Sequence, residues 1–382
     1  MRLAIRLHRW LACLPLVLAM HAAGADTLRL DSAAGKLAVS TVATGLDTPW
    51  SLAFLPDGRM LVSERPGRLR IIHADGTLSA PVAHVPPVHA AGQGGLLDVV
   101  LGPGFATDQR IYFSFAQPTA RGARTAVARA RLDADASPPQ LREVEVIFAQ
   151  QDDLPGGHHF GSRLVFDDTQ HLFITLGERY HARERAQALD SHLGKIVRLR
   201  ADGSVPDDNP FVGRADALPE IWSYGHRNVQ GAARHPETGA LWTHEHGPQG
   251  GDEINIPRAG ANHGWPEITF GREYVTGWQI GEGTARPDVA APVHHWTPSI
   301  APSGMSFYTG ALFPAWRGNL FVGSLKFGML VRVVLKGEKV VSEERLLTEI
   351  GHRIRDVRQG PDGALYVLDE TEGRILRIAP AR

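Results

Sequence analysis

Short hydrophobic runs, each preceded by a loop that contains Gly, Asp or Pro, recur six times along this chain. The first copy, at 56–71, reads PDGRMLVSERPGRLRI, and the last copy, at 361–378, reads PDGALYVLDETEGRILRI. The other copies begin at Pro103, Asp167, His235 and Pro314. Short apolar runs bounded by turn residues predict β-strands. Helical periodicity is scarce, and 181–189 is the best short candidate for a helix.

Six similar units of this kind predict an all-β fold, a six-bladed β-propeller. One unit cannot bury its own apolar face, so such repeats pack against one another in an array. Units built from a turn and strands, rather than from helix pairs, are typical of propeller blades. The alternating segment 37–42 could join the last blade and close the ring. An open β-sandwich is the alternative, which six similar units disfavour, so we expect the functional site at the central channel.

Composition and charge narrow the classes of partner. The 382 residues include 41 Gly and 26 Pro, which suits a turn-rich all-β protein. The net charge of −1 favours neither nucleic acid nor a membrane surface as a partner. No linker divides 26–382, so we expect one domain and a monomer. The widest gap between repeats, about 251–313, predicts long loops that form a binding mouth.

The first 25 residues have the pattern of a cleaved secretory signal. Three arginines precede an apolar stretch at 10–20, and small residues at 23–25 then provide a cleavage site before Asp26. The apolar stretch is too short for a membrane anchor. Cys13, the single cysteine, lies inside this signal, so the mature chain needs no disulfide. We therefore expect a periplasmic protein without a membrane span.

Polar residues concentrate in four places between the repeats: 158–164, 224–231, 244–255, and the basic residues around Lys326 and Arg353. A propeller places equivalent loops around one axis, so these groups can converge. Lys326, Arg353, Arg355 and Arg227 would make a cationic channel that suits a multiply charged anion. A histidine that titrates near neutrality among them would be a general base.

Other interpretations of the same residues remain open. Gly247 and Pro248 offer backbone carbonyls of the kind that Ca²⁺ binds, whereas the neighbouring GDEIN sequence is often only a turn in which a carboxylate caps backbone donors. Arg353 and Arg355 alternate on a strand and would usually form a solvated face. Zinc is disfavoured because there is no HxxxH helix, and no nucleophile elbow, Walker loop or dinucleotide fingerprint is present.

Five longer segments together resemble the glucose/sorbosone dehydrogenase family, and within it the soluble quinoprotein aldose sugar dehydrogenases. They are GQGGLLDV at 92–99, HFGSRL at 159–164, GHRNVQG at 225–231, EHGPQGGDEIN at 245–255 and RIRDV at 353–357. The segments stand in family order, and the resemblance covers about 41–378. It implies a six-bladed β-propeller that binds pyrroloquinoline quinone (PQQ) and Ca²⁺. It also implies oxidation of aldose mono- and disaccharides to lactones at the anomeric carbon, with an electron acceptor that the sequence does not identify.

The resemblance also implies a role for individual residues. His159 matches the base that takes the proton of the anomeric hydroxyl, Glu178 the carboxylate that orients it, and Gln93 a glutamine that lines the site. The residues that match groups near the cofactor are Arg227, Asn228, Ser299, Lys326, Arg353 and Arg355. The carbonyls of Gly247 and Pro248 match ligands of the activating Ca²⁺. Glu253 and His263 fall where family members bind a further calcium, with His263 in place of a tyrosine.

Two departures from the family pattern concern the substrate. His158 stands where some members carry a carboxylate, and Thr297 stands where glucose enzymes carry a tryptophan. We therefore expect broad use of aldoses, without a strict preference for glucose. The alternatives are a calcium-dependent propeller lactonase, which would need converging carboxylates and Asn, and a propeller that only binds a protein or glycan.

Overall fold

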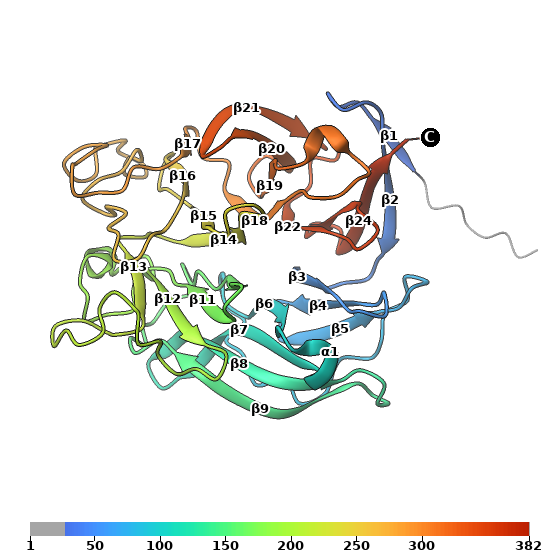
Figure 1. Cartoon of the computed structure of the whole chain (residues 1–382), viewed down its shortest axis with the longest axis horizontal. Coiled ribbons are helices and arrows are strands. Elements are labelled where there is room, and N and C mark those ends of the chain that lie inside the picture. The colour runs from blue at the N-terminus through green and yellow to red at the C-terminus, as the bar shows by residue number, and fades with distance from the viewer. Residues whose placement is uncertain (1–26, 382) are drawn as a thin grey trace, which may run out of the picture.

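The computed structural model describes residues 27–381, so the predicted signal at 1–25 lies outside them. The described chain forms six antiparallel sheets, which follow one another in chain order around a common centre (Figure 1). This arrangement confirms the six-bladed β-propeller. No helix within residues 27–381 is long and apolar enough to cross a membrane.

Each sheet is one blade, and we number the blades in chain order. Blade 1 contains β3 (Pro49–Phe54), β4 (Met60–Glu64) and β5 (Arg68–Ile72). Blade 2 contains β6 (Leu96–Leu101), β7 (Arg110–Thr119), β8 (Gly122–Asp133) and β9 (Gln140–Ala149). Blade 3 contains β10 (Leu164–Phe166), β11 (His171–Thr175), β12 (Lys195–Arg200) and β13 (Ile221–Tyr224). Blade 4 contains β14 (Val229–Arg234), β15 (Leu241–Glu245), β16 (Asp252–Asn255) and β17 (His294–Trp296). Blade 5 contains β18 (Pro302–Phe307), β19 (Leu320–Ser324), β20 (Met329–Lys336) and β21 (Lys339–Leu346).

Blade 6 joins the two ends of the described chain. It contains β22 (Ile354–Gln359), β23 (Leu365–Asp369) and β24 (Arg374–Pro380), followed by β2 (Leu37–Ala43) and β1 (Leu28–Leu30). β2 pairs antiparallel with β24, with Val39 opposite Ile378. The expected closure at 37–42 is therefore confirmed. Closure of this kind pairs a strand edge that would otherwise be open.

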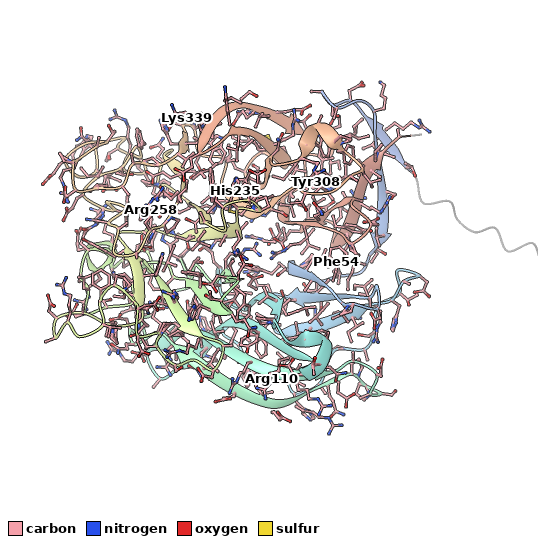
Figure 2. The ribbon with its side chains drawn as sticks, viewed as in Figure 1. Phe54, Arg110, His235, Arg258, Tyr308 and Lys339 are labelled. Carbon is pink, nitrogen blue, oxygen red and sulfur yellow. The ribbon has the colours of Figure 1, made fainter. Side chains whose placement is uncertain are left out.

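The six repeats of the sequence correspond to the second strands of the six blades: β4, β7, β11, β15, β19 and β23. These strands are covered on both faces by neighbouring blades, and every residue of β4 and of β19 is buried. Burial on both faces explains why they read as continuous apolar runs rather than as an alternating pattern. Side chains fill the space between successive sheets (Figure 2), so the core consists of the layers between blades.

Helical structure in the described residues is limited to short turns: α1 (Phe105–Asp108) and the 3₁₀ turns η1 (Arg183–Ala186) and η2 (Pro314–Trp316). The helix expected at 181–189 is thus reduced to η1. The buried Lys195 ammonium binds the carbonyls of Arg185, Ala186 and Leu193 at 3.1, 2.8 and 2.7 Å. Those carbonyls are therefore satisfied by a side chain, which stabilises an irregular loop where the pattern predicted a helix.

Candidate functional site

Two loops of blade 3 form a buried histidine–carboxylate pair. His159 comes from the loop before β10 and Glu178 from the loop after β11, and His159 Nδ1 is 3.1 Å from Glu178 Oε2. The His159 backbone N–H donates to the side-chain oxygen of Gln93 at 2.8 Å. Gly177 permits this approach, because a Cβ there would collide with the carbonyl oxygen of His159. Since Nδ1 bonds Glu178, Nε2 is the ring nitrogen that can accept a proton.

Burial sets the protonation state of His159, whose residue surface is only 5% exposed. Burial lowers the pKa of His159 to about 4, and the hydrogen bond with Glu178 only partly opposes that shift. The nearby Arg227 charge contributes to the same lowering. The sequence suggested a histidine that titrates near neutrality; the structure instead lowers the pKa of His159, so its imidazole is neutral across the physiological range.

Arg179 holds the loop of the histidine in place. Its guanidinium donates to the carbonyls of His158, Ala123 and Gly156 at 2.9, 2.6 and 2.7 Å. His159 has φ +50° and Arg179 has φ +63°, in the left-handed region that non-glycine residues rarely occupy. Such backbone persists only where neighbours over-determine it. Sequence reasoning missed Arg179, because an arginine after a catalytic motif carries no signal of which distant carbonyls it binds.

Arg227 and Asn228 lie beside this pair and hold unpaired polar atoms. Arg227 Nη1 donates to the carbonyls of His246 and Gly247 at 3.0 and 2.8 Å, and the Glu178 N–H donates to the Arg227 carbonyl at 3.0 Å. Among the described residues, Arg227 Nε and Asn228 Nδ2 are buried donors without a hydrogen-bond partner. Buried donors are almost always paired in folded proteins, so this arrangement suits a bound ligand with acceptor oxygens.

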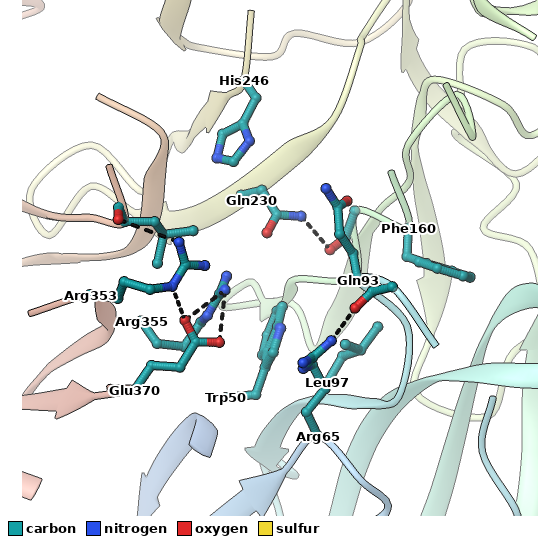
Figure 3. A pocket seen from close by; sticks show the side chains of 13 residues that line it. Trp50, Arg65, Gln93, Leu97, Phe160, Gln230, His246, Arg353, Arg355 and Glu370 are labelled. Atoms are coloured by element: carbon teal, nitrogen blue, oxygen red, sulfur yellow. Dashed lines mark hydrogen bonds and ion pairs between the residues drawn. The ribbon is translucent and has the colours of Figure 1, made fainter. Parts of the chain in front are cut away.

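A cavity of about 180 Å³ opens at the centre of the ring next to these residues. Figure 3 shows Arg353 and Arg355 directed to Glu370 on one side, with Arg65 and Gln93 across the cavity. Arg353 Nε and Arg355 Nη2 are 2.8 and 3.1 Å from the Glu370 carboxylate. Burial opposes ionisation of Glu370, yet the two arginines outweigh it and lower its pKa. With three arginines against one glutamate, the lining has a positive balance that fits an anionic ligand.

One residue expected at the cofactor lies at the rim of the cavity rather than in its lining. Lys326 is exposed in the turn after β19 and does not line the cavity, although its neighbour Leu325 does. The Lys326 ammonium lies 5.2 Å from the ring of Phe327 and, within residues 27–381, pairs with no carboxylate. Lys326 is therefore a rim residue here, whereas Arg353 and Arg355 line the cavity as expected.

Asp252 connects the Ser299 loop to the Gly247 loop. The Ser299 hydroxyl donates to Asp252 at 2.7 Å, and the same carboxylate accepts from the backbone N–H groups of Gly247 and Ile300 at 2.9 and 2.8 Å. Residues 252–255 of GDEIN form strand β16 rather than a turn, but the Asp252 carboxylate does cap backbone donors, as that interpretation expected. Ser299 is half-buried and anchored to protein.

The residues around Gly247 supply only part of a calcium site. The Gly247 carbonyl accepts from Arg227, and a cation beside a guanidinium is repelled unless an anion lies between them. Calcium takes six to eight oxygen ligands, whereas Gly247 and Pro248 offer two carbonyls. In the described part of the chain no group of three or more His, Cys, Asp or Glu side chains is placed to hold a metal. Ca²⁺ therefore fits here only together with an anionic ligand that supplies further oxygens.

Glu253 and His263 line one small cavity of about 10 Å³, together with Glu245. Burial, followed by the charge of Glu245, raises the pKa of Glu253 to about 8. His263 stacks on His226 with ring centroids 4.5 Å apart, and burial lowers the pKa of His263, so its ring is neutral. Both ring nitrogens of His263 lack a partner among the described residues. The structure thus brings together the two residues that the resemblance pairs.

A larger cavity of about 350 Å³ lies outward of the histidine pair. Glu178, Arg227 and Pro248 form its inner wall, and Tyr180 and Tyr274 are among the residues of its outer wall. Tyr274 belongs to the long segment between β16 and β17, within the region that the sequence predicts as a binding mouth. This segment lines the cavity, and its role as a binding mouth stays a prediction. Sequence alone did not single out either tyrosine.

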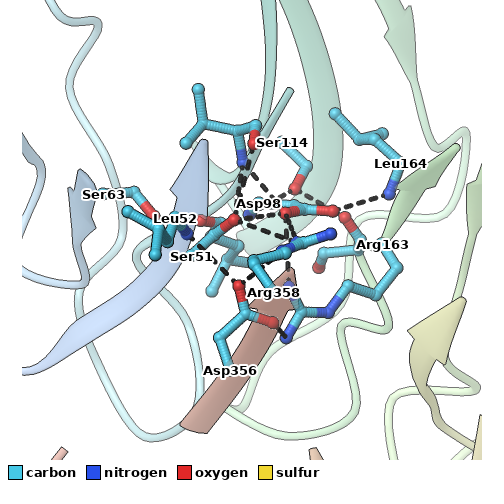
Figure 4. A network of polar contacts seen from close by, with 12 residues as sticks. Ser51, Leu52, Ser63, Asp98, Ser114, Arg163, Leu164, Asp356 and Arg358 are labelled. Carbon is cyan, nitrogen blue, oxygen red and sulfur yellow. Dashed lines mark hydrogen bonds and ion pairs between the residues drawn. The ribbon is translucent and has the colours of Figure 1, made fainter. Parts of the chain in front are cut away.

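A second buried polar cluster lies beside the central cavity (Figure 4). Arg163 lies 3.3 and 3.2 Å from Asp98 and Asp356, and Arg358 lies 3.2 and 2.9 Å from the same two carboxylates. The four residues come from blades 2 and 6 and from the residue before β10 of blade 3. The Arg163 guanidinium lies 4.1 Å above the ring of Trp50, which lines the cavity. Two positive and two negative charges balance, which indicates a structural link between blades.

Comparison with known proteins identifies the family of this chain. The sequence profile described as glucose/sorbosone dehydrogenase matches residues 46–377. The aldose sugar dehydrogenase YliI of Escherichia coli is 50% identical over 342 residues, which are 88% of this chain and 91% of that protein. The crystal structure of the apo form of the soluble aldose sugar dehydrogenase from Escherichia coli has a TM-score of 0.87 and 47% identity, covering 90% of this chain and 100% of that one. The structure of the PQQ-bound form of the aldose sugar dehydrogenase from Streptomyces coelicolor has a TM-score of 0.72 and 30% identity. It covers 90% of this chain and 98% of that one.

Proposed function

The chain belongs to the glucose/sorbosone dehydrogenase family and is an oxidoreductase, and from that premise we propose that it oxidises aldose sugars at the anomeric carbon to lactones, with PQQ as the electron acceptor. The observation that carries the proposal is the buried His159–Glu178 pair beside a cavity with a positive balance of charge. A base that is neutral at physiological pH and an anion-binding cavity are the two elements that this reaction needs.

The residues of the central cavity fit an anionic cofactor. PQQ carries carboxylates, and Arg353, Arg355 and Arg65 supply the cationic donors that bind carboxylates. The unpaired donors of Arg227 and Asn228 suit its quinone oxygens. When bound, the cofactor supplies a carbonyl that accepts the hydride. Lys326 would assist from the rim, and Ser299 through its hydroxyl.

The side chains of this chain then act on the sugar. His159 Nε2 takes the proton of the anomeric hydroxyl as the hydride leaves the same carbon, so the sugar loses two electrons and the cofactor gains them. Glu178 holds the imidazole through Nδ1 and stabilises the imidazolium that forms. A positioned base of this kind contributes on the order of 10² to 10⁴ in rate. The Arg227 guanidinium would hold the acceptor oxygen of the bound cofactor and could stabilise negative charge there.

We include Ca²⁺ in the proposal at two places. The first lies at the carbonyls of Gly247 and Pro248 and is completed by oxygens of the cofactor. The second lies at Glu253 and His263, where an ion would relieve the repulsion between Glu253 and Glu245. In the first place the Arg227 guanidinium would repel Ca²⁺ unless the anionic cofactor lies between them, so Ca²⁺ and cofactor should bind cooperatively.

We also propose a substrate range, a cellular location and an oligomeric state for the protein. Thr297, in place of a tryptophan, leaves the mouth open and supports broad use of aldoses, including disaccharides. The signal pattern at 1–25 supports export to the periplasm. We propose a monomer that passes electrons to an acceptor still to be identified.

Reconstitution tests the proposal. Purified apoprotein should oxidise glucose, galactose, xylose and maltose with an artificial electron acceptor only after PQQ and Ca²⁺ are both added, and a chelator should reverse this. The product should be the lactone, identified by mass spectrometry. Turnover that depends on NAD, or that proceeds without PQQ and metal, would refute the proposed chemistry.

A further inference from the structure

The outer cavity has a different charge from the central one. Its lining includes two arginines, Arg183 and Arg227, and three glutamates, Glu178, Glu184 and Glu273. The Arg183 guanidinium pairs with Glu273 at 2.6 Å, which joins the loop after β11 to the long segment after β16. Mixed charges of this kind disfavour an anionic ligand and supply donors and acceptors for a neutral one with many hydroxyls.

Aromatic rings stand on the outer side of the same cavity. Tyr180 is 40% exposed and Tyr274 is 47% exposed, and both line it. Trp278, four residues after Tyr274, is 73% exposed. Large aromatic side chains that remain exposed together mark a binding surface more often than a structural one. Their flat apolar faces and polar edges suit a sugar ring, which has an apolar face and a rim of hydroxyls.

Tyr274 is held close to the reacting groups by its own hairpin. Residues 272–279 form this hairpin, in which Arg272 pairs with Gln279 and the Glu273 N–H donates to the Trp278 carbonyl at 2.8 Å. The hairpin base pairs with Gln249, next to Pro248. Gly271 permits this contact, because a Cβ there would collide with the Pro248 ring. At the hairpin tip, the Tyr274 hydroxyl lies 3.5 Å from Arg227 Nη2.

We propose that this outer cavity binds the second sugar ring of a disaccharide whose reacting ring lies at His159, and that Tyr274 determines the preference for such substrates; this rests on the sugar oxidation proposed above. The cavity shares Glu178 and Arg227 with the reacting groups but is not lined by His159. A ring that occupies it would therefore lie next to the ring that is oxidised, with Tyr180, whose ring centroid is 5.3 Å from that of His159, between the two. Its volume of about 350 Å³ is in the range of small-ligand pockets.

The test compares one disaccharide with its monosaccharide in three variants. Tyr274→Ala should lower kcat/KM of the reconstituted enzyme for maltose about tenfold more than for glucose, because it removes the aromatic wall. Tyr274→Phe should retain most of the preference, because the ring remains. Val275→Ala is the matched control: it lies on the same hairpin, is fully exposed and does not line the cavity, so its ratio of maltose to glucose should equal that of the wild type.

A binding measurement separates this inference from the function on which it rests. The apoprotein is titrated with maltose and with glucose, and tryptophan fluorescence reports on Trp265, which lines the cavity, and on Trp278. Maltose should bind more tightly than glucose, and Tyr274→Ala should remove the difference. Equal losses for both sugars in Tyr274→Ala, or an equal effect of Val275→Ala, would overturn the second-ring site. If the reconstituted protein oxidises no sugar, yet maltose binds and Tyr274→Ala abolishes that binding, the oxidation fails while the cavity assignment stands.

Discussion

Two buried polar clusters lie side by side at the centre of this ring, and they differ in how their charges are balanced. In one, Arg163 and Arg358 each pair with both Asp98 and Asp356. In the other, three arginines and one glutamate line the cavity, only Arg353 and Arg355 pair with that glutamate, and buried donors of Arg227 and Asn228 lack partners among the described residues. In a neutral cluster the protein itself compensates every charge, which indicates a structural role. A cluster with surplus positive charge and unpaired donors can instead bind an anionic ligand. The comparison separates scaffold from site without reference to any relative.

We expect the largest effect on stability when one charge of the balanced cluster is removed. Asp98→Asn keeps the shape of the side chain but leaves Arg163 and Arg358 to share Asp356, so a buried positive charge is uncompensated. We expect the free energy of unfolding to fall by about 3–5 kcal/mol, measured by denaturant titration of the apoprotein. Asp216→Asn, which breaks the exposed pair with Arg214, is the control and should leave the free energy of unfolding almost unchanged. Equal losses in the two variants would contradict the structural role of the cluster.

The second prediction concerns the base at the unbalanced site. His159→Ala should lower kcat on the order of 10² or more while PQQ still binds, because the imidazole is a base and not a cofactor contact. His158→Ala, the exposed neighbour, should retain most of kcat. In the wild type, the rate of the sugar step should remain high well below pH 6.5, because burial lowers the pKa of His159 to about 4. Stopped-flow reduction of the bound cofactor measures the effects of the substitutions and the pH dependence of the sugar step. A rate that falls on acidification near pH 6.5, or a larger loss in His158→Ala than in His159→Ala, would make the assignment of His159 as the base wrong.

The third prediction compares two cations of the site. Arg355 is buried and lines the cavity, whereas Lys326 is exposed at its rim. Arg355→Ala should weaken PQQ binding by about 2–5 kcal/mol, the cost of removing one partner of a buried charged pair. Lys326→Ala should cost about 1 kcal/mol or less, because an exposed ion pair contributes little. Cofactor titration by absorbance measures both affinities. If Lys326→Ala proves the more damaging, the lysine must move into the cavity when the cofactor binds.

The smallest effect is expected at Glu253. Its pKa of about 8 in the folded protein lies above the usual carboxyl value, so the folded chain keeps a proton that the unfolded chain has released. Its contribution to stability therefore falls as pH rises from about 4.5 to about 8. Glu253→Gln lacks this loss, so in a chelator its melting temperature should exceed that of the wild type by a few degrees at pH 8 and by less at pH 5. Glu237→Gln, at an exposed position, should follow the wild type at both pH values.

Much of the fold was predictable because the repeats are a local property of the sequence. Each second strand is covered on both faces, so its apolar run is continuous and easy to recognise. The closure by 37–42 followed from alternation in that segment and is confirmed by its pairing with β24. The helix expected at 181–189 was wrong in extent, because Lys195, on a strand nearly ten residues away, satisfies the carbonyls in that loop. The helix propensity of this segment did not predict its structure, because the contacts with Lys195 stabilise a different backbone conformation.

The candidate site was predictable in its members but only partly in its geometry. His159 and Glu178 meet as expected, and Arg353 and Arg355 line the cavity. Nothing in the sequence indicated that Glu370 would pair with both arginines, or that Lys326 would remain at the rim. Those outcomes depend on how adjacent turns of blades 5 and 6 project toward the axis.

The sequence by itself determined that this protein is a ring of six β-blades, and it identified the segments that carry the chemistry. Both are properties of residues close together in the chain: an apolar run between turn residues, or a motif of several adjacent polar groups. The tertiary structure alone decided which charges are paired and which face a ligand, as for Arg355 beside Glu370 and Tyr274 beside Arg227. Charge balance, burial and the pKa shifts that follow arise from groups on different strands and loops, and only the folded chain brings these groups within a few ångströms of one another.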